Sequence, residues 1–168
     1  MVPDMPDNNL LNSLAIFVAQ YLYIVLLAIA LVWYLMQSRS AQIEMIAWGV
    51  VALPLMYILL LVAGIVYFDP RPFVSDGVTP LILHDPDNGF PSDHTLLCSA
   101  TSSIVFFYNK KFSGILWLLT ALVGFSRVYT GIHHPLDIIA SVIMAITLSV
   151  LVWKFVLPII KRSSWYVW

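Results

Sequence analysis

Three short stretches of the chain combine arginine, histidine, serine and aspartate at close spacing. Phosphoryl transfer suits this set, because the transferring group spreads negative charge over its oxygens and is stabilised by positioned positive charge. Arginine binds two such oxygens at once through its planar fork. Histidine serves as a nucleophile or as an acid and base. The three stretches are Phe68-Asp69-Pro70-Arg71-Pro72-Phe73, Phe90-Pro91-Ser92-Asp93-His94 and the segment from Ser126 to Asp137.

The spacing within the third stretch assigns further roles. His133 and Asp137 are four residues apart, and Pro135 between them is a good first residue for a helix. A helix that begins there places Asp137 in its first turn, where the carboxylate can reach a ring nitrogen of His133 and fix its tautomer. The free N–H groups of that helix, and of one that begins near Ser92, would point towards a bound phosphate.

The composition indicates that these residues belong to a protein embedded in a lipid bilayer. The chain has 168 residues, of which 61% are hydrophobic and 10% are charged, whereas a soluble domain is about 45–50% apolar and about 25% charged. We therefore expect residues 1–168 to form a single membrane-embedded domain. The net charge of −1 argues against a nucleic-acid partner. The single cysteine, Cys98, excludes an intrachain disulfide, and its apolar setting favours a packing role.

A helix that crosses a membrane needs about 20 mostly apolar residues, and the sequence predicts five such segments. The fold class is therefore all-α, an integral membrane helical bundle. Many of the segment ends carry aromatic residues, as expected at the headgroup level. The third segment is short and is expected to start near Ser92. The predicted spans are Asn12–Met36, Ile43–Phe68, Leu96–Tyr108, Phe112–Thr130 and Ile138–Leu157.

Basic residues predict the orientation of the bundle. With five spans, six of the eight basic residues fall on one side, which the positive-inside rule makes cytoplasmic. The other two, Arg71 and Arg127, lie at the opposite side together with all four histidines, so we expect the chemistry to face the periplasm or the exterior. The six are Arg39, Lys110, Lys111, Lys154, Lys161 and Arg162.

The N-terminal segment agrees with this orientation. Residues 1–9 contain Asp4 and Asp7 and no basic residue, which favours placement outside the cytoplasm. A secretory signal begins with positive charge, so we expect no cleavable signal here.

Taken together, the motifs resemble those of the type-2 phosphatidic acid phosphatase (PAP2) superfamily, membrane lipid phosphatases related to vanadium haloperoxidases. That pattern is K-x6-R-P, then P-S-G-H, then S-R-x5-H-x3-D. The second motif has Asp93 where glycine is usual, and the first keeps Arg71-Pro72 but has Gly64 at the lysine position. Both departures resemble bacterial undecaprenyl-diphosphatases of the bacitracin-resistance type. The third motif is complete, with Ser126, Arg127, His133 and Asp137.

The resemblance implies a role for each matching residue. It implies that His133 attacks phosphorus, supported by Asp137, and that His94 protonates the leaving group and later activates water. It implies that no metal or other cofactor takes part. The phosphoryl oxygens would be held by Arg71, Arg127 and Ser92.

Plainer interpretations exist for several of these residues. Arg127 or Asp137 alone could interact with lipid headgroups at a helix end, and Ser126 is expected to support the site without binding phosphate. Asp93 could cap the third span or tune His94. His134 is expected to cap the fifth span or face water, and Asp69 and Asp76 to be solvated loop acids. A further alternative is a metal site formed by His84, Asp85, Asp87 and His94. The Asp-Pro-Asp-Asn-Gly segment is explained more simply as a series of turns.

The leading functional hypothesis is hydrolysis of undecaprenyl diphosphate through a phospho-histidine. The alternative within enzymes is a lipid phosphate monoesterase acting on phosphatidic acid or phosphatidylglycerophosphate. A third possibility transfers the phosphate to an acceptor other than water. A non-catalytic membrane helper is a different class, and the gathering of charged residues at one face argues against it.

Overall fold

The structure is a computed structural model that describes residues 9–162, and Asp4 and Asp7 lie outside this range. Within it the prediction of an all-α fold is confirmed, because the only extended pairing is the isolated bridge between Pro70 and Asn88. The helices are α1 (Asn9–Leu35), α2 (Arg39–Val66), α3 (Pro72–Ser75), α4 (Asp93–Phe106), α5 (Lys110–Tyr129), α6 (Pro135–Leu151), a π-helical turn (Val152–Val156) and α7 (Leu157–Arg162).

Local sequence explains where these helices begin. The side chain of Ser38 caps α2 by accepting the N–H of Ala41, and that of Asn109 caps α5 by accepting the N–H of Phe112. Pro72 and Pro135 occupy first-turn positions of α3 and α6, where a missing N–H costs nothing. The expected start of the last span at Pro135 is thus observed.

Within residues 9–162, four helical segments are long and apolar enough to cross a membrane: Leu10–Leu35, Arg39–Val66, Lys110–Tyr129 and Pro135–Ile159. The predicted third span is the exception. Helix α4 has 14 residues, about 21 Å at 1.5 Å per residue, against a hydrocarbon core of about 30 Å. The prediction of five spans is therefore approximate, and α4 is better described as a short helix held inside the bundle.

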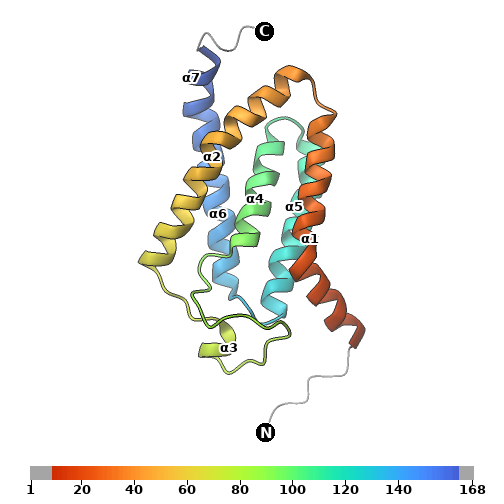
Figure 1. The fold of residues 1–168 in the computed structure, drawn as a ribbon, viewed down its shortest axis with the longest axis vertical. Helices are drawn as coiled ribbons and strands as arrows, with labels where there is room; N and C mark the ends of the chain where they lie inside the picture. The colour runs from red at the N-terminus through yellow and green to blue at the C-terminus, as the bar shows by residue number, and fades with distance from the viewer. Residues whose placement is uncertain (1–8, 163–168) are drawn as a thin grey trace.

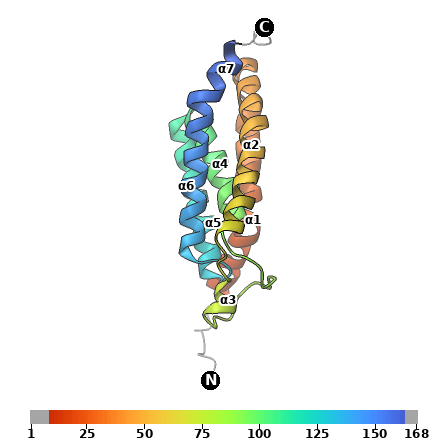
Figure 2. The same cartoon turned by 90° about the vertical axis from the view of Figure 1, so that its left-hand side faces the viewer.

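Helix α4 occupies the centre of the bundle, packed against both α5 and α6 (Figures 1 and 2). It contributes to two apolar clusters on opposite faces. One joins α2, α4 and α6, and the other joins α1, α4 and α5; Cys98 is fully buried in the second, in agreement with the expected packing role. Because α4 is enclosed on several sides, its start at Ser92 is fixed relative to all of the neighbouring helices.

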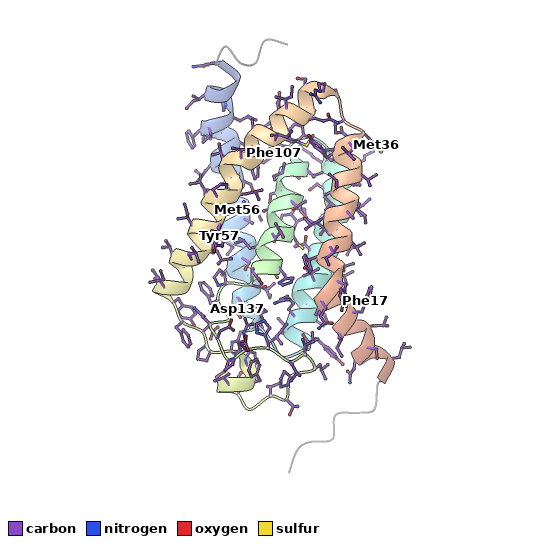
Figure 3. The ribbon with its side chains drawn as sticks, viewed as in Figure 1. Phe17, Met36, Met56, Tyr57, Phe107 and Asp137 are labelled. Carbon is purple, nitrogen blue, oxygen red and sulfur yellow. The ribbon has the colours of Figure 1, made fainter. Side chains whose placement is uncertain are left out.

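The two ends of the bundle differ in chemistry. The α1–α2 and α4–α5 turns lie at one end with the C-terminal helix, while α3 and the long loop after α2 lie at the other (Figure 1). Figure 3 shows Met36 and Phe107 towards the first end and Asp137 towards the second. The predicted separation of the basic turns from the chemical residues is therefore observed.

A close approach between helices fixes the position of the chemical end. Helices α4, α5 and α6 meet at Gly124, where an added Cβ would lie 2.6 Å from Ile138 Cγ2 and 3.8 Å from the Thr95 side chain. Only glycine allows α6 to lie this close to α5. Gly114, on the same helix, has nothing within 4 Å of an added Cβ.

Gly124→Val should lower the midpoint of thermal denaturation in detergent by roughly 5 °C, because overpacking costs about 1–3 kcal/mol. Gly114→Val is the matched control, with the same change of helix propensity and no clash, and should leave the midpoint unchanged. Equal midpoints for the two variants would show that α5 and α6 are not closely packed at Gly124.

Candidate active site

The structure brings the three chemical stretches to one end of the bundle. Arg71 precedes α3, Arg127 lies in the last turn of α5, and Asp137 lies in the first turn of α6. His133 is in the short turn between α5 and α6, whose chain reversal uses Gly131 at φ +74°. Arg71, Arg127, His133 and Asp137 are each at most 5% exposed, so they form one buried polar group.

His133 and Asp137 form the pair that their spacing predicted. His133 Nδ1 lies 3.1 Å from Asp137 Oδ2, and the same oxygen accepts the backbone N–H of His134 at 2.9 Å. A carboxylate only accepts hydrogen bonds, so this contact assigns the proton of the neutral ring to Nδ1. The lone pair of the ring is then on Nε2, which faces away from Asp137.

Two guanidinium groups face that nitrogen. Arg127 Nη2 lies 3.0 Å and Arg71 Nη1 lies 3.4 Å from His133 Nε2. Each arginine is fixed by other contacts: Arg127 donates to the carbonyl of Ala19 on α1, while Arg71 donates to the carbonyl of Ile132 and pairs with Asp87. The unprotonated nitrogen of His133 therefore points at positive charge that can bind phosphoryl oxygens.

The surroundings keep the His133 ring uncharged. Burial lowers the pKa of His133, and the nearby cations of Arg127 and Arg71 lower it further, while the hydrogen bond to Asp137 opposes the shift. A lowered pKa leaves the imidazole neutral at physiological pH, so that Nε2 keeps the lone pair that a histidine nucleophile requires.

His94 has a carboxylate of its own. Asp93 Oδ1 lies 2.8 Å from His94 Nδ1, accepts the backbone N–H of His94, and lies 3.7 Å from Arg127 Nη2. The edge of the His94 ring also meets the ring of Tyr23, with centroids 4.4 Å apart. Of the two roles considered for Asp93, tuning of His94 therefore fits the geometry, because the cap of α4 is the neighbouring Ser92.

The two predicted serines lie beside this group and are held by local contacts. Ser92 Oγ is fully buried and contacts Oγ1 and the backbone N–H of Thr95. Ser126 Oγ donates to the carbonyl of Val123, in keeping with a supporting position. The role of Ser92 as a phosphate ligand remains a prediction.

Several residues around the site were not found from the sequence. The prediction that Asp69 is a solvated loop acid is wrong: its side chain is 14% exposed and lies 3.3 Å from His134 Nδ1. His134 caps α6, as expected, and its Nε2 contacts Asp76 at 3.2 Å. The predicted motifs gave no reason to pair Arg71 with Asp87 or to place Tyr23 near His94.

The metal site considered among His84, Asp85, Asp87 and His94 is not assembled, because Asp87 pairs with Arg71 and His94 pairs with Asp93. Among residues 9–162, ligand atoms close enough for a metal ion occur elsewhere. They belong to Asp69, His134 and Asp137 and lie within 4.8 Å of one another.

The structure also explains why Gly64 occupies the position that the resemblance assigns to lysine. An added Cβ at Gly64 would lie 3.3 Å from the carbonyl oxygen of Phe90 and 3.5 Å from Asn88 Nδ2. Asn88 donates to the carbonyls of Gly64 and Tyr67, which fixes the loop against the end of α2. That loop occupies the space where a longer side chain would start.

Comparison with known proteins agrees with the geometry. The profile of the PAP2 superfamily matches residues 17–161, and the chain belongs to this superfamily. Undecaprenyl-diphosphatase BcrC of Bacillus subtilis (strain 168) is 36% identical over 151 residues, which cover 88% of this chain and 76% of the relative. Bacitracin transport permease protein BcrC of Bacillus licheniformis is 34% identical over 149 residues, covering 88% and 72%.

One solved structure shares the fold. The crystal structure of Aquifex aeolicus LpxE superposes with a TM-score of 0.69 over 87% of each chain, at 24% sequence identity. The expected PAP2-like helical core is therefore confirmed.

Asp93→Asn should lower kcat by about 10–100-fold, the usual cost of losing a carboxylate that orients a functional histidine. The control is Asp85→Asn, an exposed acid of the loop that precedes α4, which should retain full activity. Steady-state kinetics on the purified proteins measure kcat for both variants. An Asp93→Asn enzyme as active as the Asp85→Asn control would show that Asp93 does not orient His94.

Proposed function

We propose that this membrane protein hydrolyses undecaprenyl diphosphate to the monophosphate and inorganic phosphate. The observation that carries the proposal is the buried His133, with Asp137 on Nδ1 and two guanidiniums facing Nε2. The names of the Bacillus subtilis relative and of a 32% identical undecaprenyl-diphosphatase from Sulfolobus acidocaldarius support this lipid as the substrate.

The geometry supports a two-step reaction. His133 Nε2 attacks the terminal phosphorus while Arg71 and Arg127 hold its oxygens, and the bond to the bridging oxygen breaks to release the lipid monophosphate. His94 donates a proton to the leaving oxygen where one is needed. His94, neutral once it has given up its proton, takes a proton from water in the second step, and the water attacks the phospho-histidine and releases inorganic phosphate and free His133.

One observation favours the alternative substrate class, a lipid phosphate monoester such as phosphatidic acid. Cleavage of a monoester expels an alkoxide, which needs a proton, whereas cleavage of a diphosphate expels a phosphate that leaves more easily. An acid oriented by its own carboxylate, as His94 is by Asp93, is of greater use for the poorer leaving group. Gly64 also removes one cation that a second phosphate would use.

We further propose that the protein lies in the cell (cytoplasmic) membrane with its active site facing the periplasm or exterior. The basic residues Arg39, Lys110 and Lys111 begin helices at the end opposite to His133, and the positive-inside rule places that end in the cytoplasm.

The substrate proposal is tested by phosphate release from purified protein with undecaprenyl diphosphate, undecaprenyl phosphate and phosphatidic acid in one detergent. The diphosphate should give the highest kcat/KM. His133→Ala should lose at least about a thousandfold in rate, while His84→Ala, on the exposed loop, should not. Higher kcat/KM for phosphatidic acid would favour the monoesterase, and activity of His133→Ala within tenfold of wild type would refute the nucleophile.

The orientation is tested by labelling single cysteines in intact cells, in a Cys98→Ser background. Leu83→Cys, at a side chain that is 98% exposed in the loop near the site, should react with a membrane-impermeant thiol reagent. Lys111→Cys, at the opposite end, should react only after the cells are permeabilised. The reverse pattern would place the active site in the cytoplasm.

A further inference from the structure

One oxygen of the catalytic-site carboxylate has no partner. Asp137 Oδ2 accepts two hydrogen bonds, from His133 Nδ1 and from the backbone of His134. Asp137 Oδ1 is buried without a hydrogen-bond partner, in a residue that is 0% exposed. A buried carboxylate oxygen with no donor destabilises the folded state, so a donor is expected nearby.

Asp69 is the side chain placed to supply that donor. Its backbone is fixed by two hydrogen bonds, from its N–H to Asn88 Oδ1 and from the Gly89 N–H to its carbonyl, each 2.9 Å. Its carboxyl group lies in the same cluster as Asp137 and His134, with ligand atoms within 4.8 Å of one another. His134 Nδ1 is 3.3 Å from Asp69 Oδ2.

The loop that holds Asp69 also shields the pair from water. A Cβ added at Gly89 would lie 3.1 Å from Asp137 Oδ2 and 3.3 Å from the carbonyl oxygen of Asp69. The backbone at Gly89 thus lies directly against the two acids. A side chain at this position would require the loop or Asp137 to shift by a few tenths of an ångström.

Two carboxyl groups this close and this buried do not both ionise readily. Burial raises the pKa of Asp69, the neighbouring Asp137 raises it further, and His134 opposes the shift. The ionisable groups that face Asp69 are Asp137 and His134, with His133 and Asp76 behind them. Because Asp137 already accepts hydrogen bonds from His133 and His134, a proton shared by the two acids is better placed on Asp69.

We propose that Asp69 is a positioning residue that, as a neutral carboxylic acid, donates a hydrogen bond to the free oxygen of Asp137. Asp137 would then accept three hydrogen bonds, which fix its plane and hold the Nδ1 proton of His133 in place. The inference rests on the proposed role of His133 as nucleophile. It adds a third member to the His133–Asp137 pair, from a stretch of the chain about 65 residues earlier.

The test compares Asp69→Asn with Asp69→Ala by steady-state kinetics. The asparagine amide can replace the donor, so Asp69→Asn should keep kcat within about threefold of wild type. Asp69→Ala removes the donor and should lower kcat by about 10–100-fold with little change in KM. Asp76→Asn, the half-exposed acid on the far side of His134, is the control and should lose less than twofold.

The pH profile gives a readout that a merely structural role would not move. Asp69 donates only while protonated, so its contribution is present below its raised pKa and is lost as the pH rises through that value. Wild type should therefore lose kcat on the alkaline side, and this loss should shift to higher pH or vanish in Asp69→Asn. The same profile in both proteins would overturn the proposal.

Two other outcomes would also overturn it. If Asp69→Asn is as impaired as Asp69→Ala, and wild type loses activity in EDTA and regains it with Mg²⁺, the cluster binds a cation instead. If Asp69→Ala has wild-type kcat, Asp69 has no positioning role. His133→Ala in the same series distinguishes failure of the proposed nucleophile from failure of the Asp69 proposal. An active His133→Ala enzyme refutes the nucleophile. With His133→Ala inactive, the Asp69 variants test the positioning role alone.

Discussion

The structure depends on one buried contact network, in which the ring of His133 lies between the carboxylate of Asp137 and the guanidiniums of Arg127 and Arg71. Asp137 fixes the proton on one nitrogen, and the two cations face the lone pair on the other. Burying these charges is costly unless they are paired. Arg71 pairs with Asp87 and Arg127 with Asp93, whereas one oxygen of Asp137 has no hydrogen-bond partner among the described residues. In the proposed reaction, phosphate replaces the guanidinium contacts with Nε2 while the cations remain beside it.

The helical scaffold is arranged to hold this network. The central helix α4 is too short to span a bilayer, so its capped start lies within the bundle, where Ser92 meets α6 through the hydrogen bond from Ser141 Oγ. Gly124 lets α5 and α6 approach closely just before the turn that holds His133. The long loop after α2 covers the network from outside and contributes Arg71, Asp87 and Asp69. The membrane helices thus set the distances, and the loop completes the charge pairing.

Local patterns predicted the helices, the start at Pro135 and the His133–Asp137 pair, because each depends on residues within one or two turns. The loop was not predictable in this way. Whether Asp69 is solvated or buried depends on Asn88 and Gly89 nearly 20 residues later and on α6 far along the chain. The reason for glycine in place of lysine at position 64 likewise depends on the distant loop, which Asn88 holds against the end of α2. The sequence predicted that the third segment is short, but hydropathy does not register that neighbouring helices enclose it.

The central claim is that His133 becomes covalently phosphorylated, and rapid-quench trapping tests it most directly. Undecaprenyl diphosphate labelled on the terminal phosphate would be mixed with the His94→Asn enzyme, in which the first step needs little acid help while hydrolysis of the intermediate lacks its base. If His133 is the nucleophile, about one acid-labile, base-stable phosphate should form per protein. Peptide mapping should locate it at His133, and it should be absent when His133 is also replaced by alanine. Label on a different residue, or turnover in His94→Asn with no trapped phosphate at any quench time, would contradict the central claim.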